Sequence, residues 1–290
     1  MQRLRSIKYV AAWAYGLHRE GVTIGLVPTM GALHDGHRSL IRAARLSCDA
    51  VAVSIFVNPM QFGPLEDLDR YPRTIARDLR LCEQEGTDVV FVPRAGAMYP
   101  PAFETVVSVQ RLTRRFEGIS RPGHFGGVTT VVTKLLNVIG PEKVFFGRKD
   151  YQQAAVVARL VQDLNWPTAI VVCPTVREAD GVALSSRNKF LSPTERKAAT
   201  VLYRALSAAR TVIRRGERSV NRVRAVLTQL IWAEPLARLD YAAVVHPTTL
   251  EELRVVRGRM VLLLAVWVGK TRLIDNLVVT APGTPPRISR

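Results

Sequence analysis

The chain has 290 residues, 48% of them hydrophobic, a composition typical of a globular protein with one large core or two smaller ones. Its longest apolar run, Met260 to Gly269, is too short to span a membrane, and its N-terminus lacks the apolar stretch of a secretory signal. The formal net charge is +17, but the basic residues are spread along the chain without the aromatic interleaving of an RNA-binding surface. We therefore interpret the charge as a property of the solvated surface that also steers anionic substrates, and expect no nucleic-acid or membrane partner.

Short β-branched segments alternate with helical segments over residues 1–175. The predicted strands are Val22–Val27, Ala50–Asn58, Asp88–Val92, Lys143–Phe146 and Thr168–Val172. The predicted helices between them are His37–Ser47, Thr74–Gln84, Phe125–Val138 and Tyr151–Leu164. This alternation predicts a doubly wound, Rossmann-like parallel sheet, in which ligands bind beyond the carboxyl ends of the strands.

A smaller α+β domain is predicted over residues 176–279. Ser192, Pro193 and Glu195 have the spacing of an N-cap, a first helical residue and a capping-box partner. The predicted helices are 193–214 and 218–231, and the predicted strands lie within 239–247 and 259–268. Residues 280–290 are rich in proline and are predicted to be a disordered tail.

The three cysteines, Cys48, Cys82 and Cys173, are dispersed and lack the spacing of metal ligands. An odd number of separated thiols is typical of a reducing compartment. We therefore expect a cytoplasmic protein.

His34 and His37 stand three residues apart where the first predicted strand gives way to a helix. At this spacing both imidazoles can face the same way, beside helix-terminal N–H groups that attract phosphate. They can donate hydrogen bonds to phosphate oxygens as charge develops in a phosphoryl or nucleotidyl transfer, and Gly31 and Gly36 allow a nucleotide close to the backbone. The alternative is a pair of capping histidines without a ligand. A metal site is not favoured, because no third ligand of suitable type lies nearby.

Six segments, in this order and spacing, resemble one family. They are PTMGALHDGHRSL (28–40), SIFVNPMQFG (54–63), YPRT (71–74), RPGHF (121–125), VFFGRKDYQQ (144–153) and READGVALSSRN (177–188). The first contains the HxGH signature of the nucleotidyltransferase superfamily. Together they resemble the pantoate–β-alanine ligase (pantothenate synthetase) family over about residues 4–279.

The resemblance implies a reaction in two steps. Pantoate and ATP first form pantoyl adenylate and pyrophosphate, and the amine of β-alanine then attacks the adenylate to give pantothenate and AMP. Mg²⁺ is expected to be bound chiefly by the ATP phosphates and water, not by a protein cage. The family also implies a homodimer, a domain 1–175 for nucleotide and pantoate, a lid domain 176–279, and a gate at 64–74.

The resemblance also implies the site residues. The catalytic residues would be His34, His37, Lys149, Ser185 and Arg187. The ATP-binding residues would be Pro28, Thr29, Met30, Gly31, His34, Gly36, His37, Gly147, Lys149, Asp150, Val176, Leu184, Ser185, Ser186 and Arg187. The pantoate-binding residues would be Met30, Gln61, Val128, Val132 and Gln153, and those for β-alanine Asn58 and Gln61. Arg121 and His124 would lie near the pantoate and pyrophosphate region, and no residue is assigned as a metal ligand.

Chemistry supports several of these roles. An ammonium such as that of Lys149 can act as a point charge on the β- and γ-phosphates, and the Asp150 carboxylate can accept from ribose hydroxyls. Two hydroxyls and the Arg187 guanidinium at one turn can clamp a triphosphate. The alternative for Lys149 is an ordinary surface lysine, which its flanking residues disfavour. A lone glutamine is usually a surface residue, so the roles of Gln61 and Gln153 rest on the resemblance.

The sequence departs from the family pattern at two points. Leu184 stands where the family usually has methionine, a volume-conserving change that we expect to be mild. After YPRT only Asp78 remains of an acidic cluster, which could alter the gate or a metal contact.

Other classes of protein explain the motifs less well. A mononucleotide adenylyltransferase would share HxGH but is not expected to carry NPMQFG and GRKDYQQ together. A nucleic-acid-binding module is favoured by the charge alone. An inactive homologue is disfavoured, because all five predicted catalytic residues are present.

Overall fold

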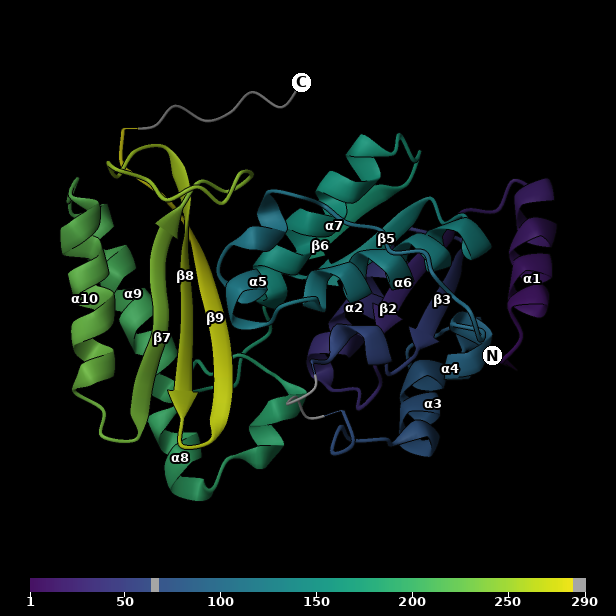
Figure 1. Ribbon diagram of the computed structural model, residues 1–290, viewed down its shortest axis with the longest axis horizontal. Helices are drawn as coiled ribbons and strands as arrows, with labels where there is room; N and C mark the ends of the chain where they lie inside the picture. The colour runs from purple at the N-terminus through teal and green to yellow at the C-terminus, as the bar shows by residue number, and fades with distance from the viewer. Residues whose placement is uncertain (64–67, 284–290) are drawn as a thin grey trace. The chain divides into compact units, whose positions relative to one another are not determined.

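The chain folds into two compact units, residues 1–176 and 177–290, in a computed structural model (Figure 1). The structure describes residues 1–63 and 68–283. Residues 64–67 of the predicted gate and 284–290 of the predicted tail therefore lie outside the described residues. The tail begins later than predicted, because Thr280 still belongs to the strand β9 (Thr271–Thr280). Within the described part of the chain, no helix has the length and apolar character needed to cross a membrane.

The first unit contains a parallel sheet of six strands in the order β1-β4-β3-β2-β5-β6. The strands are β1 (Gln2–Leu4), β2 (Ile24–Thr29), β3 (Ala50–Ile55), β4 (Val89–Phe91), β5 (Lys143–Gly147) and β6 (Ala169–Cys173). Ile24 pairs with Ala50 and Gly25 with Lys143, so β2 lies between β3 and β5. The predicted doubly wound sheet is confirmed.

Helices connect these strands. They are α1 (Ile7–Arg19), α2 (Asp35–Arg45), α3 (Ile75–Gln84), α4 (Ala95–Met98), α5 (Glu117–Ser120), α6 (His124–Ile139) and α7 (Tyr151–Asp163), with 3₁₀ turns η1 (Pro59–Gln61), η2 (Leu112–Arg114) and η3 (Arg148–Asp150). The predicted helices correspond to α2, α3, α6 and α7. The structure adds β1, α1, α4 and α5. β1, α4 and α5 are too short to show a period in the sequence.

β2 and β3 form the centre of the sheet because both are almost continuously apolar and buried. Strands covered on both faces need such runs rather than an alternating pattern. On one face, Val27, Val53 and Phe145 share a core with Ile41 of α2 and Cys82 of α3. The alternate side chains of the same strands point to the opposite face.

The strand order reverses at β2. The chain runs from β2 through β3 to β4 on one side, whereas β5 lies on the other side of β2 and leads to β6. Ligands of doubly wound sheets bind outside the carboxyl ends of the strands at such a switch point. The turns that follow β2 and β5 both lie at this end of the parallel sheet.

The second unit contains an antiparallel sheet of β7 (Ala237–Val245), β8 (Arg259–Val268) and β9 (Thr271–Thr280) in that order. The helices α9 (Thr200–Arg214) and α10 (Val220–Trp232) lie side by side and pack against it (Figure 1). β8 is buried over nearly its whole length because it is the central strand. The predicted small α+β fold is confirmed, with β9 as an additional strand.

The helix α8 (Pro193–Ala198) begins at the predicted capping box. Ser192 Oγ accepts a hydrogen bond from Glu195 N at 3.3 Å, and Glu195 Oε2 accepts one from Ser192 N at 2.8 Å. The prediction of a single helix over 193–214 is wrong, because the chain turns at Ala199 and α9 follows as a separate helix.

Candidate active site

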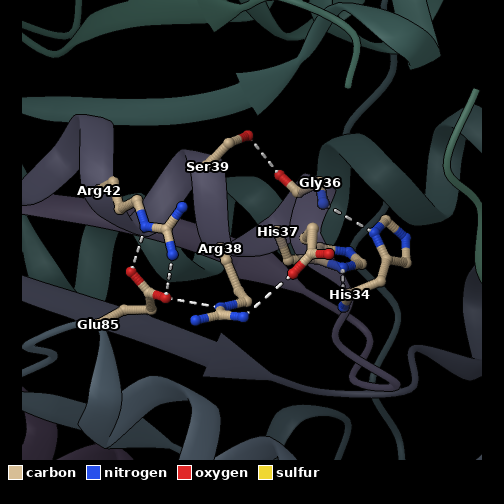
Figure 2. Close-up of polar contacts among 8 residues, drawn as sticks. His34, Gly36, His37, Arg38, Ser39, Arg42 and Glu85 are labelled. Carbon is tan, nitrogen blue, oxygen red and sulfur yellow. Dashed lines mark hydrogen bonds and ion pairs between the residues drawn. The ribbon is translucent and has the colours of Figure 1, made fainter. Parts of the chain in front are cut away.

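The turn between β2 and α2 brings His34 and His37 together (Figure 2). His34 is the N-cap of α2 and has an extended backbone, with φ −139° and ψ 177°. The two ring centroids are 4.1 Å apart, and the ring planes are inclined by 44°. The spacing of three residues thus places both imidazoles at one point on the carboxyl end of the sheet.

Each of these rings accepts a backbone hydrogen bond through Nδ1. Gly36 N donates to Nδ1 of His34 at 3.1 Å, and His34 N donates to Nδ1 of His37 at 3.3 Å. A ring nitrogen that accepts from an N–H carries no proton, so a neutral ring then carries its proton on Nε2. The two histidines therefore cap the helix and at the same time keep Nε2–H as their donor. Capping and ligand binding are compatible here.

His37 is held in its neutral form. Its pKa is lowered to about 3, chiefly because burial disfavours the charged ring, and also because His34 and Lys149 lie nearby. Asp150 acts in the opposite direction. Although the residue keeps partial solvent exposure, its ring is surrounded by protein atoms and basic groups. At neutral pH it can therefore act as a hydrogen-bond donor and not as a cation.

Lys149 and Asp150 follow β5 at the same end of the sheet. Gly147 is the last residue of β5, and the 3₁₀ turn η3 carries both charged residues. Nζ of Lys149 lies 3.7 Å from Oδ1 of Asp150, and the lysine side chain is only 18% exposed. Both residues act on the pKa of His37 through their charges, Asp150 raising it and Lys149 lowering it. The switch point thus assembles two imidazoles, an ammonium and a carboxylate.

A buried carboxyl group holds the backbone that leads into this turn. Oδ2 of Asp78 accepts from Ala32 N and Oδ1 from Leu33 N, each at 2.9 Å, and Asp78 is 1% exposed. Ala32 has φ 52°, in the left-handed region that disfavours a side chain. A Cβ at Gly31, with φ 85°, would lie 3.1 Å from Cγ2 of Ile55 and 3.2 Å from Oδ2 of Asp78. The carboxyl group therefore stabilises a strained turn.

The orientation of α2 is fixed by a second buried acid (Figure 2). Glu85 accepts from Nε of Arg38 at 2.6 Å and from Nε and Nη2 of Arg42 at 2.6 and 2.7 Å. These hydrogen bonds, that of Arg42 foremost, lower the pKa of Glu85. Because Glu85 caps the C-terminal end of α3, the ion pairs connect the histidine-bearing helix to α3.

A second polar turn, residues 58–61, follows β3. Oδ1 of Asn58 accepts from Tyr99 Oη at 2.8 Å and Met60 N at 3.3 Å. Nδ2 of Asn58 donates to Oε1 of Gln61 at 2.8 Å and to Gly127 O at 3.0 Å. An amide has two donor hydrogens and two acceptor lone pairs, so these four partners use the full capacity of the buried Asn58.

Arg121 and His124 contact the backbone of Gln61. Nδ1 of His124 lies 2.9 Å from Gln61 O, and Nη2 of Arg121 donates to the same oxygen at 3.2 Å. A carbonyl oxygen can only accept, so Nδ1 of His124 carries a proton, and Nε2 accepts from Nη1 of Arg121 at 3.1 Å. Both side chains therefore help to fix the position of Gln61.

The helix α6 lies directly on this turn. A Cβ at Gly127 would lie 2.2 Å from Met60 O, so only glycine permits the approach. Val128 and Val132, one helical turn apart, are 2% and 3% exposed. Gln153 of α7 is partly exposed, whereas the adjacent Gln152 is buried and donates to Leu112 O and Arg115 O at 2.8 Å each.

The serine-rich turn belongs to the second unit. Ser185 is the N-cap of the 3₁₀ turn η4 (Ser186–Phe190), and its Oγ accepts from Arg187 N at 3.3 Å. Asn188 Nδ2 donates to Ala183 O at 3.1 Å and closes the turn. The predicted residues Leu184 to Arg187 are thus ordered by their own local hydrogen bonds.

Arg177 anchors the segment that leads into this turn. Its guanidinium makes two hydrogen bonds to the buried carboxylate of Asp275, at 2.6 and 2.8 Å, and lies 4.4 Å from the ring centroid of Tyr203. Val176, the residue before it, ends the first unit. A bidentate pair of this kind fixes geometry as well as charge.

Comparison with known proteins gives a consistent result. A model of the Pantoate-beta-alanine ligase family matches residues 2–278. The chain is 53% identical over 279 residues to a pantothenate synthetase from Heliobacterium modesticaldum, which covers 96% of this chain and 99% of that protein. The chain belongs to the pantoate–β-alanine ligase family.

Two solved structures extend this similarity to the fold. Pantothenate synthetase from Thermus thermophilus has a TM-score of 0.91 and 46% identity, over 96% of this chain and 99% of the other. A pantoate–β-alanine ligase from Francisella tularensis, complexed with beta-gamma ATP and β-alanine, has a TM-score of 0.79 and 35% identity, over 96% and 97%. By family, therefore, the protein is a ligase with the fold of the pantothenate synthetases.

Within this family framework, the first unit brings most predicted residues to one end of its sheet. Pro28 and Thr29 end β2, and Oγ1 of Thr29 accepts from Gly31 N at 3.2 Å. Met30 is partly exposed beside them. Among the described residues, no three His, Cys, Asp or Glu groups gather to hold a metal ion.

Sequence motifs gave no site role to Tyr99 and only a doubtful one to Asp78. Tyr99 lies 41 residues from the asparagine that it contacts, and Asp78 lies 46 residues from Ala32. Contacts between residues so far apart in the chain leave no local pattern in the sequence. The only available signal for Asp78 was an acidic residue in the first turn of a helix beside the family motif.

Proposed function

We propose that this family member joins pantoate to β-alanine at the expense of ATP and releases AMP and pyrophosphate. The observation that carries the proposal is the pair of Nε2–H donors on His34 and His37, set beside Lys149 at the switch point of the sheet. The family assignment and the full-length similarity to pantothenate synthetases support the choice of substrates.

The first step activates the carboxylate of pantoate. One of its oxygens forms a bond to the α-phosphorus of ATP, and the bond from that phosphorus to the bridging oxygen breaks, so pyrophosphate leaves with the electron pair. Negative charge grows on the phosphate oxygens as this happens. The Nε2–H groups of His34 and His37 and the ammonium of Lys149 are positioned to stabilise it, and a neutral His37 does so without losing a proton.

The second step forms the amide. The neutral amine of β-alanine attacks the acyl carbon of pantoyl adenylate, the bond to the adenylate oxygen breaks, AMP leaves, and the nitrogen loses a proton. A carboxylate is a poor acyl donor, whereas AMP is a good leaving group. The residues then mainly position the two reactants.

Pantoate would contact Met30, Gln61, Val128, Val132 and Gln153 in this proposal. The two valines supply an apolar wall for the methyl groups, and the two glutamines supply polar contacts for the oxygens. Asn58, which we assigned to β-alanine together with Gln61, has all four of its hydrogen-bonding positions filled by protein groups. We propose that it acts through Gln61.

ATP would contact the histidine turn and the turn after β5, with the ribose at Asp150. We propose that Ser185, Ser186 and Arg187 contact the triphosphate, and that the predicted lid domain, residues 176–279, covers the nucleotide. Mg²⁺ would come bound to the ATP phosphates, because the described residues provide no group of three ligands. It would neutralise phosphate charge.

We also propose a homodimer and a cytoplasmic location. The homodimer rests on the family resemblance, and light scattering of the purified chain tests it. The location is supported by the thiols of Cys48, Cys82 and Cys173, which are all free and buried.

The test is pantoate-dependent exchange of labelled pyrophosphate into ATP, with Mg²⁺ and without β-alanine. Exchange that requires pantoate supports adenylate formation, and amide formation on adding β-alanine completes the reaction. If ATP binds but pantoate supports no exchange, the carboxylic acid is wrongly assigned and other acids are screened.

A further inference from the structure

The orientation of the Gln61 side-chain amide is determined by backbone groups beyond its own partner. Asn58 lies between Met60 N, which can only donate, and Gly127 O, which can only accept. The first contact requires Oδ1 of Asn58 and the second requires Nδ2, so the amide of Asn58 has one possible orientation. Nδ2 therefore faces Gln61.

The orientation of Gln61 follows from that of Asn58. The atom 2.8 Å from Nδ2 of Asn58 must accept a hydrogen bond, so it is Oε1 of Gln61. The NH₂ end of Gln61 then points away from Asn58, and in the described part of the chain no group accepts a hydrogen bond from it. Gln61 is 8% exposed, and its Nε2 is not among the fully buried unpartnered atoms of the described residues, so this NH₂ group keeps contact with solvent. A solvent-accessible donor that no protein group uses is available to an oxygen of a bound ligand.

Tyr99 completes this arrangement from the C-terminal end of α4. Its hydroxyl donates to the second lone pair of Asn58 Oδ1 at 2.8 Å. Burial raises the pKa of Tyr99 to about 12, so the hydroxyl keeps its proton at any physiological pH. The ring is held by edge contacts with Phe103 at 5.1 Å and by a tilted contact with Phe56 at 6.0 Å between centroids. These contacts aim the hydroxyl at Asn58.

We propose that Tyr99 is a positioning residue that acts through Asn58 to keep the NH₂ end of Gln61 facing the substrate. Gln61 then recognises pantoate only as a hydrogen-bond donor, toward a carboxylate or hydroxyl oxygen. The choice of pantoate as the ligand rests on the proposed function. The amide orientation itself rests on the hydrogen bonds of the first unit alone.

The kinetic test replaces the hydroxyl and keeps the ring. Tyr99→Phe is compared with wild type and with Tyr15→Phe, an exposed tyrosine on α1 as the matched control. In pyrophosphate exchange, we expect Tyr99→Phe to raise the KM for pantoate about five- to tenfold, the effect of one lost hydrogen bond, and to leave the KM for ATP within twofold. A shift of both KM values together, or a rate equal to that of Tyr15→Phe, would overturn the proposal.

A double-mutant cycle separates positioning from general stability. If Tyr99 acts through Gln61, Tyr99→Phe has no more than about a twofold effect on exchange when Gln61→Ala is already present. Independent effects that multiply in the double variant would show that Tyr99 has no path through Gln61.

A measurement without substrate keeps the inference separate from the proposed function. The side-chain NH₂ resonances of Gln61 in ¹⁵N-labelled protein are identified by their absence in Gln61→Ala. We expect Tyr99→Phe, but not Tyr15→Phe, to shift or broaden them. Unchanged resonances would refute the relay even if the enzyme is active. A shift in Tyr99→Phe, together with no pantoate-dependent exchange by the wild-type protein, would refute only the proposed function.

Discussion

Two turns of the first unit each orient a polar side chain at the end of a strand, but they are stabilised by different contacts. The histidine turn (residues 28–37) follows β2 and the amide turn (residues 58–61) follows the neighbouring β3. In each, an N-capping side chain accepts a hydrogen bond from the N–H two residues ahead, His34 from Gly36 and Asn58 from Met60. A polar side chain one turn along the chain is thereby oriented.

The support behind the two turns differs. The histidine turn passes through Ala32 in the left-handed region and is held by the buried carboxyl group of Asp78. The amide turn contains no residue with positive φ. Its Asn58 side chain is held by neutral groups, among them Tyr99 and the Gly127 carbonyl, while Arg121 and His124 hold the Gln61 carbonyl. A strained backbone needs the stronger acceptor, so substitutions behind the histidine turn should be the more damaging to activity. The stability of the amide turn should depend more on close packing, and so on the volume of the side chains that contact it.

The largest effect is expected for the side chains that the histidine turn presents. His34→Ala, His37→Ala or Lys149→Ala should lower the rate of pyrophosphate exchange about 100- to 1,000-fold, the usual consequence of removing one charge-stabilising donor. Circular dichroism should show an intact fold. The control is His246→Ala, because Nδ1 of His246 also accepts from backbone N–H groups, those of Thr248 and Thr249, at 3.2 Å each. A wild-type rate in any of the three variants would remove that residue from the assignment.

The second prediction concerns the close packing of α6 on the amide turn. Gly127→Ala forces a Cβ to within 2.2 Å of Met60 O, so α6 must move away, and we expect a loss of about 3 kcal/mol in the free energy of unfolding by urea. Gly126→Ala is the control, because its Cβ would meet only Cγ1 of Val106 at an ordinary 3.5 Å. That variant should gain up to about 1 kcal/mol from helix propensity. Equal stabilities of the two variants would contradict the close packing.

The support of the histidine turn gives a smaller effect. Asp78→Asn leaves one oxygen where two N–H groups need acceptors, so one N–H faces an NH₂ group, and we expect a loss of about 2 kcal/mol in stability. The exchange rate should fall about tenfold as His34 loses its position. Asp49→Asn is the matched control, because Asp49 accepts from Thr23 N at 2.9 Å at the amino end of the strands. If both variants exchange at the same rate, Asp78 has no role in the site.

The last effect, the pH dependence of stability at His37, appears only below neutral pH. Because its pKa is lowered from 6.5 to about 3, the unfolded chain binds a proton between these values that the folded chain does not. The free energy of unfolding therefore rises with pH in this window, by up to about 1.4 kcal/mol per pH unit from this residue. His37→Gln removes this titrating group. In urea titrations, the free energy of unfolding of the wild type relative to this variant should therefore fall as the pH drops from 7 to 4.5. A constant difference would show that the ring is not shielded.

Local sequence signals predicted much of this protein. Continuous apolar runs predicted β2 and β3, the alternation with helices predicted the doubly wound sheet, and the spacing of Ser192 and Glu195 predicted the start of α8. Each of these follows from hydrophobic periodicity or from hydrogen bonds within four residues. The family motifs likewise occupy short stretches, so the family too could be predicted from the sequence.

Other features were decided by tertiary structure. Asp78 reaches Ala32, Tyr99 reaches Asn58, and Gly127 meets Met60 only after distant segments have packed together. Tertiary structure also distinguishes the adjacent glutamines of α7. Gln152 donates hydrogen bonds to backbone carbonyl groups in the interior, whereas Gln153 is partly exposed.

The sequence by itself determined which residue types stand at the carboxyl ends of the strands, because strand and helix periods are local properties. The tautomers of His34 and His37 likewise follow from local hydrogen bonds, donated by Gly36 N and His34 N. Only the tertiary structure decided which end of the Gln61 amide faces outward and why His37 stays neutral. These depend on hydrogen-bond partners and on burial, and both are supplied largely by residues far away in the chain.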